Sequence, residues 1–192
     1  MADNFGNLDW VDGQVSVPGI YPELYFTTKN SIVAWPQLPD APADAAAEVT
    51  LAGNFTLGLE ADEVTSKVWK RVNCIDIKSQ PTSEQQGEVR CKTYLNKLKV
   101  VVSLTNEEAT ALAKLAANTD LVWAFRERDS GKFRVCGSEK FMTVTKVTLD
   151  IGGAPTSEKG TTIEIEAVDV CPFPFYDGLI TDDAGEVNPA AV

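Results

Sequence analysis

The sequence predicts a mainly β protein, with a β-sandwich-like or barrel-like fold that contains two long hairpins and one flanking α-helix. Several segments of the 192-residue chain alternate apolar and polar residues with the period of a strand. Two stretches share one turn-forming pattern, and a single segment has the period of a helix. The 44% hydrophobic content suits a packed core, so we expect one β-rich domain over residues 20–178.

The ends of the chain and its N-terminal third are expected to hold arms, strands and a loop. Residues 1–19 are punctuated by Asp, Gly and Asn and predict an irregular arm. Residues 20–26 and 47–59 are strand-like, whereas the three prolines of residues 35–42 favour an extended loop between them. Residues 179–192 are small and acidic, which predicts a solvated C-terminal tail.

One helix and one tight hairpin follow each other in the middle of the chain. Thr105 and Glu108 form a capping-box pattern, and alanine and leucine recur at helical spacing as far as Asn118, a candidate left-handed stop. The helix should therefore span residues 105–118 and pack on a sheet. Residues 121–136 then alternate as two strands around a Gly-containing turn.

The two long hairpins are predicted from an internal repeat. Residues 75–77 (Ile-Asp-Ile) precede Pro-Thr-Ser-Glu at 81–84 after three residues, and residues 149–151 (Leu-Asp-Ile) precede Pro-Thr-Ser-Glu at 155–158 at the same distance. Strand-like segments flank both copies, so we expect two equivalent hairpins side by side in one sheet. The residues expected on this inner sheet or at subunit interfaces are Ile75, Asp76, Ile77, Pro81, Glu84, Leu149, Asp150, Ile151, Pro155, Glu158, Glu164 and Glu166.

The two predicted hairpins differ in charge. Residues 66–99 carry eight positive and three negative side chains, whereas residues 149–171 carry one positive and five negative ones. Complementary strands at opposite edges of a subunit would attract one subunit to the next. The alternative is that both sets of charges belong to solvated sheet faces.

Residues that could support catalysis or hold a cofactor are scarce. The chain has no histidine, so it has no histidine-containing triad or histidine-based metal site, and it has no phosphate-binding loop. Its four cysteines form no Cys-x-x-Cys pair and are expected to be reduced and buried. The sequence leaves open one catalytic arrangement, a pair of Asp or Glu carboxylates. We therefore expect neither enzyme activity nor a cofactor or metal.

Charge and hydropathy limit the partners. The net charge of −11 argues against tight, non-specific binding to nucleic acid. No stretch approaches the roughly 20 apolar residues of a membrane helix, and the N-terminus shows no signal-peptide pattern. Synthesis in a host cytoplasm, without a membrane partner, is the expectation.

Residues 66–178 resemble the tail-tube (major tail) proteins of tailed bacteriophages. The resemblance lies in the order of the helix, the 121–136 hairpin, the Gly-Gly-Ala-Pro-Thr-Ser-Glu-Lys-Gly turn, the strand over 161–170 and the Cys-Pro-Phe-Pro-Phe-Tyr segment that ends at Tyr176. The resemblance implies a β-sandwich-like subunit, six copies of which form a ring. Each subunit would give four strands to an inner barrel, and stacked rings would form the virion tail tube through which DNA passes.

Other assignments follow from the same residues. A tail terminator, a head-decoration protein or a baseplate protein is the first alternative, and a carbohydrate-binding or carboxylate-dependent β-sandwich is the second. A deep pocket lined by Asp, Glu and Trp would favour the latter. Aromatic residues near the termini either close the core of their own subunit or anchor arms on neighbours. These residues are Phe5, Trp10, Phe173, Phe175 and Tyr176.

Overall fold

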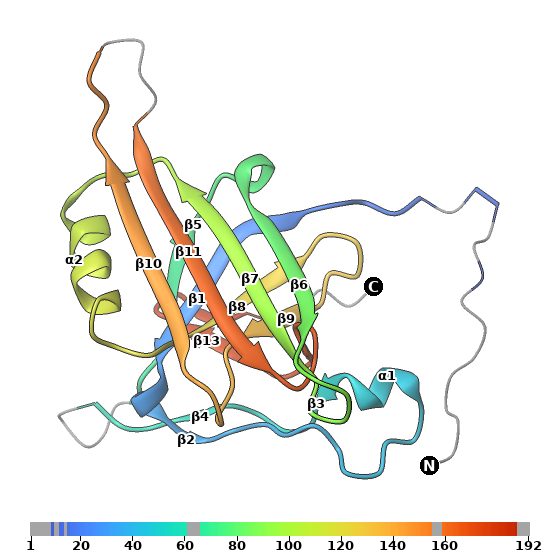
Figure 1. Cartoon of the computed structure of the whole chain (residues 1–192). Helices are drawn as coiled ribbons and strands as arrows, with labels where there is room; N and C mark the ends of the chain where they lie inside the picture. The colour runs from blue at the N-terminus through green and yellow to red at the C-terminus, as the bar shows by residue number, and fades with distance from the viewer. Residues whose placement is uncertain (1–8, 10–11, 14, 61–65, 155–158, 188–192) are drawn as a thin grey trace.

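The computed structural model describes residues 9, 12–13, 15–60, 66–154 and 159–187. These residues form a mainly β structure with two short 3-10 helices and two α-helices (Figure 1). The elements are β1 (Ile20–Thr28), η1 (Lys29–Ser31), β2 (Ile32–Ala34), α1 (Ala45–Glu48), β3 (Thr50–Leu51), β4 (Thr56–Leu57), β5 (Lys70–Asn73), η2 (Asp76–Lys78), β6 (Gln80–Gln86), β7 (Thr93–Val102), α2 (Glu107–Ala116), β8 (Leu121–Glu127), β9 (Phe133–Cys136), β10 (Thr143–Asp150), β11 (Gly160–Asp169), β12 (Phe175–Tyr176), β13 (Ile180–Asp182) and β14 (Gly185–Val187).

Two large sheets make up the body of the molecule. One has six strands in the order β3-β12-β9-β8-β1-β5, and the other has four in the order β10-β11-β7-β6. In Figure 1 the four-stranded sheet lies in front of β1 and β8, which cross behind it. Within the described residues neither sheet closes into a barrel, and the sheets β2-β4 and β13-β14 are accessory.

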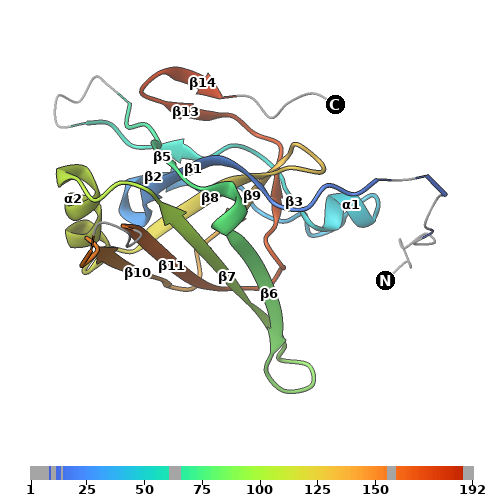
Figure 2. The ribbon, with the colours of Figure 1, turned by 90° about the horizontal axis from the view of Figure 1, so that it is seen from above.

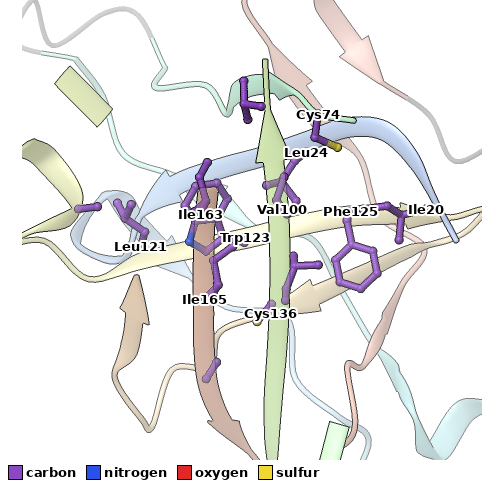
Figure 3. Close-up of a cluster of buried hydrophobic side chains, with 14 of the residues drawn as sticks. Ile20, Leu24, Cys74, Val100, Leu121, Trp123, Phe125, Cys136, Ile163 and Ile165 are labelled. Atoms are coloured by element: carbon purple, nitrogen blue, oxygen red, sulfur yellow. The ribbon is translucent and has the colours of Figure 1, made fainter. Parts of the chain in front are cut away.

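The main core lies between the two large sheets. Val100 of β7 and Ile163 and Ile165 of β11 are at most 1% exposed and face the six-stranded sheet (Figure 3). Trp123 and Phe125 of β8 meet them from that sheet and are as deeply buried. Burying such large apolar side chains from both sheets is the main source of stability and fixes the strand register.

A second core on the far side of the six-stranded sheet corrects the prediction of a solvated C-terminal tail. Residues 179–187 form the β13-β14 hairpin, and Ile180 is fully buried there with Trp69. The Trp69 backbone N–H also donates to the carbonyl of Thr181 (2.8 Å). Asp183 and Glu186 are exposed, whereas Asp182 is buried beside Arg71. Ile180 packs in the same cluster as Val122 and Ala124 of β8. Residues 188–192 lie outside the described part of the chain.

The predicted helix exists but starts later than expected. α2 begins after Asn106, whose side-chain carbonyl accepts the N–H of Ala109 (3.1 Å), so Asn106 is the N-cap in place of Thr105. Asn118 has no left-handed conformation, because Ala117 ends the helix with ordinary right-handed geometry. The segment 47–59 is also not one strand: it holds the end of the single-turn helix α1 and the two-residue strands β3 and β4.

Three predicted elements are confirmed. β1 begins at Ile20, β8 and β9 form the hairpin within residues 121–136, and residues 35–42 run without regular helix or strand. The described residues of the N-terminal arm are exposed and irregular. In the described part of the chain, no helix combines the length and apolarity that crossing a bilayer requires.

Candidate assembly surface

The four-stranded sheet consists of two hairpins that lie side by side. β6 and β7 form the first hairpin, β10 and β11 form the second, and β7 pairs with β11 between them. All three pairings are antiparallel, so the turn of the first hairpin and the turn of the second lie at opposite ends of the sheet. In Figure 1 the C-terminal end of β10 and the start of β11 lie at the opposite end of the sheet from the β6–β7 turn. The predicted neighbouring hairpins are therefore present.

The two repeat copies, however, occupy different structures, which corrects the expected equivalence. Residues 81–84 lie inside β6, and the chain turns later, at Gly87 (φ 95°) and Arg90 (φ 73°). In the second copy, Leu149 and Asp150 end β10, so the turn follows them directly. A β-carbon on Gly87 would lie 2.6 Å from the Cys91 carbonyl oxygen, so this tight turn requires glycine.

The predicted interface residues lie at several places around the sheet. Ile75 caps η2, Ile77 is 92% exposed, and Asp76 forms an ion pair with Arg128 that lowers the pKa of the Asp76 carboxyl. Ile151 is 77% exposed beyond β10. Pro81, Glu84, Leu149, Asp150, Glu164 and Glu166 lie on the sheet itself, whereas Pro155 and Glu158 lie outside the described residues.

The outward face of the sheet brings the charges of the two hairpins together. Glu164 of β11 lies between Lys99 of β7 and Lys146 of β10, with 3.6 Å from carboxylate oxygen to ammonium nitrogen on each side. Lys97 pairs in the same way with Glu84 of β6 (3.1 Å). The opposite charges therefore meet on neighbouring strands within one chain. This corrects the expectation that they mark opposite edges, because β7 and β11 are the two central strands.

The sheet has two edges at which backbone groups are free to pair. The Ile75 N–H donates to the Val101 carbonyl (2.7 Å), so odd-numbered residues of β7 direct their backbone groups toward β6. By antiparallel alternation, Ser83 and Gln85 then direct theirs away from β7. The same alternation, carried through β11, points the backbone of Thr145 and Val147 away from the sheet. Among the described residues, no further strand pairs with β6 or β10, so each outer strand presents a row of backbone donors and acceptors at its free side.

Aromatic residues of the C-terminal segment close the subunit's own core. Phe173 is buried edge-to-face against Phe125, with ring centroids 5.3 Å apart, and fully buried Tyr176 packs on Phe55 at 5.1 Å. Phe175 stacks under the guanidinium of Arg134. Phe173 and Tyr176 are therefore part of the core of their own chain, and Phe175 is half-buried beside them. Phe5 and Trp10 lie outside the described residues.

Three of the four cysteines are buried, as predicted, but Cys91 is exposed in the β6–β7 turn. All four are free thiols, and burial raises the pKa of Cys171 to about 11 and raises that of Cys136 further. No group of three or more Cys, Asp or Glu in the described residues is arranged to hold a metal ion. The buried thiols act as small apolar side chains of the core.

One mixed cavity bears on the carbohydrate-binding alternative. It has a volume of about 280 Å³, and its lining includes Trp35, Glu139 and Asp169. Glu139 accepts a hydrogen bond from Gln37 (2.7 Å), and Asp169 accepts one from the backbone N–H of Val170 (2.7 Å). Burial raises the pKa of Asp169 to about 6. Its carboxyl is held by the main chain, so the cavity has one buried acid rather than a matched catalytic pair.

Comparisons with models of protein families, with curated proteins and with solved structures found no match.

Proposed function

We propose that the protein is a structural subunit that assembles with copies of itself through the edges of its four-stranded sheet. In the virion of a tailed bacteriophage, the resulting rings would stack into the tail tube through which DNA passes. The observation that carries the proposal is the four-stranded sheet itself: two adjacent hairpins, with an unpaired strand at each edge. Ring closure pairs every such edge with a neighbour. It thereby prevents the uncontrolled edge-to-edge aggregation to which an open sheet is exposed.

The two edges are compatible with one continuous antiparallel sheet. β6 and β10 run in opposite directions, so β6 of one copy can pair with β10 of the next without reversing either subunit. Ser83 and Gln85 would meet Thr145 and Val147. Pro81 has no N–H and leaves one position of the edge without a donor, so pairing would centre on the later half of β6.

The outward face of the sheet suits a channel for DNA. Its lysines at 97, 99 and 146 are each ion-paired with a glutamate, so few free cations remain to hold phosphates. The net positive charge of the first hairpin is thus offset on this face, and a neutral or weakly acidic lumen is sufficient for DNA to pass. Six subunits in each ring follow from the resemblance to tail-tube proteins.

The test is the size and shape of the purified full chain across a range of concentrations. We expect rings or tubes by negative-stain electron microscopy, and masses that are multiples of the subunit in solution. Ser83→Pro removes an N–H from the free edge of β6 and should leave folded monomers. Ala41→Pro, at an exposed position of the extended loop, is the matched control and should still assemble. A chain that stays monomeric at every concentration would overturn the proposal.

A tail terminator, head-decoration or baseplate protein remains the alternative within the same class. Such a part would form rings or attach to other virion proteins without stacking into long tubes. Electron microscopy of the same samples distinguishes these outcomes by the length of the particles.

The mixed cavity favours carbohydrate binding as a second candidate. Trp35 offers an aromatic surface, and the carboxylates of Glu139 and Asp169 offer acceptors for hydroxyl groups. Titration of neutral oligosaccharides against the full chain, followed by tryptophan fluorescence, tests this candidate. A saturable change that Trp35→Ala abolishes would support it, and the absence of any change would remove it.

A further inference from the structure

A cavity between α2 and β5 lies apart from the free strand edges. Its volume is about 410 Å³, which falls within the range of about 300–1,000 Å³ typical of small-ligand sites. Phe26, Val72, Leu104 and Leu112 give it an apolar wall, and Ala109 of α2 leaves it open on the helix side. The cavity is large enough to receive an aromatic side chain.

The cationic groups at its rim, Lys70 and Arg71, already have acidic partners. Lys70 forms an ion pair with Asp183 (2.8 Å), and Arg71 lies 3.8 Å from both Glu23 and Asp182. An anionic ligand would have to compete with these carboxylates. The side chains of the apolar wall can form no hydrogen bonds or ion pairs with a ligand, so the occupant of the cavity should be apolar.

The N-terminal arm leaves the molecule on the other side. The Val17 N–H donates to Asp129 (2.9 Å) and the Arg128 N–H donates to Gly19 (3.1 Å), which holds the base of the arm at the β8–β9 turn. Both views show residues 15–19 leading away on the side of β6, whereas α2 lies on the side of β10 (Figures 1 and 2). The arm is thus directed away from the cavity of its own subunit.

The sequence of the arm matches an apolar occupant. Residues 1–14 include Phe5, Leu8, Trp10 and Val11 and contain no lysine or arginine. Fully extended, they could span up to about 45–50 Å. If β6 of one copy meets β10 of the next, this arm points to the neighbour's α2 and to the cavity beside it.

We infer that the N-terminal arm of one copy docks into the α2–β5 cavity of the next copy, with Trp10 as the side chain that fills it. This inference rests on the proposed assembly and adds a second contact to it. Aromatic side chains are favoured at such contacts because they bury a large area at low conformational cost. The arm would clamp together two subunits whose sheets are already paired.

Mixed disulfide cross-linking tests the inference on full chains that carry Cys91→Ser. One chain carries Asp9→Cys, which leaves Trp10 in place, and a second, differently tagged chain carries Ala109→Cys at the cavity. Ala111→Cys is the matched control, because Ala111 is exposed on the same helix and does not line the cavity. We expect a 9–109 heterodimer, no 9–111 heterodimer, and at least a fivefold lower yield of the 9–109 product when Trp10→Ala is added.

The same samples separate this inference from the assembly proposal. Rings or tubes without a 9–109 product, or with equal 9–109 and 9–111 yields, overturn the arm contact and leave sheet pairing standing. A selective 9–109 product without rings supports the arm contact and overturns the tube. Absence of both overturns both.

Discussion

The two hairpins of the four-stranded sheet share one backbone pairing pattern but differ in what supports their outer strands. β10 is supported by its own subunit: α2 lies beside it, Val147 packs on the main core, and Thr145 accepts a hydrogen bond from the Trp123 indole (3.1 Å). β6 has no such support. Every residue of β6 except Pro81 is exposed, and its side-chain contacts run mainly to β7.

This difference assigns different roles to the two edges. In the proposed assembly β10 would be the preformed edge, because burial within its own chain fixes its conformation. β6 is held by its backbone and side-chain bonds to β7, so a neighbour that pairs with its outer side would bury it for the first time. An assembly in which β6 pairs with the β10 of a neighbour would join the least supported strand to the best supported one.

Matched aspartate substitutions give the largest expected contrast. Val147 and Gln85 both point to the core-facing side of the sheet, on β10 and β6 respectively. Val147→Asp places a charge against the apolar core and should lower the free energy of unfolding by about 3 kcal/mol or more. Gln85→Asp should change it by less than about 1 kcal/mol, because that position is exposed. Urea unfolding measures both, and equal losses would remove the proposed difference between the strands.

Aspartates near the two hairpins should give stability opposite dependences on pH. Asp169 ends β11, and burial raises the pKa of its carboxyl to about 6. The folded chain therefore binds the carboxyl proton more tightly than the unfolded chain does, in which the pKa has its ordinary value of about 3.9. Its stabilising effect is complete below about pH 4 and is lost as the pH rises through about 6. Replacing it by asparagine should therefore give a gain over the parent that grows across this window, by up to about 3 kcal/mol.

Asp76 provides the opposite case. The Arg128 guanidinium lowers the pKa of Asp76, so its stabilising contribution is present above about pH 4 and is lost as the pH falls further. Asp76→Asn should be less stable than the parent near neutrality and should approach it in acid. Urea unfolding between pH 2.5 and 8 measures both variants; curves that stay parallel to the parent would contradict the two assignments.

The same contrast explains which parts of the fold could be predicted from sequence. β1, β8 and β9 bury one or both faces, so their apolar residues mark them as strands. β6 is polar at nearly every position because both of its faces meet solvent, so its sequence has the pattern of a turn rather than that of a half-buried strand. Gly87, which can adopt a positive φ, was the available signal that the turn comes later.

The candidate site was predictable in part for a related reason. Periodicity identifies strands but does not say which strands are neighbours. From the sequence alone, the charge difference between the two hairpins therefore predicts a contact between copies. The pairing of β7 with β11 places Lys99 beside Glu164 inside one chain. The capping-box pattern predicts Thr105 as the N-cap, one residue before the observed N-cap Asn106, because both residues are competent caps.

Removing the charge link between the hairpins should have a smaller effect. Glu164→Gln breaks ion pairs with Lys99 and Lys146, which are largely exposed, so the loss of stability should be at most about 1 kcal/mol and should shrink with added salt. It also frees two cations on the face proposed to line the channel, so binding of duplex DNA at low salt should increase.

Glu166→Gln is the matched control for Glu164→Gln. It makes the same change in net charge on the same strand, and Glu166 forms no ion pair with a described residue. Gel-shift titrations compare the two variants. Equal retention of DNA by both would show that net charge, rather than the release of paired lysines, controls binding to this face.

Labelling of thiols gives the smallest effect on stability and the most local view of the two hairpins. Cys91 in the β6–β7 turn is exposed, whereas Cys74, Cys136 and Cys171 are buried. A water-soluble disulfide reagent should therefore react quickly with one thiol in the folded subunit and with four after unfolding, and Cys91→Ser should remove the fast phase without changing the urea midpoint. Stacked rings would meet at the ends of the sheet, where this turn lies, so the fast phase should slow in tubes but not in single rings. An unchanged rate in tubes would place the β6–β7 turn outside the contact between rings.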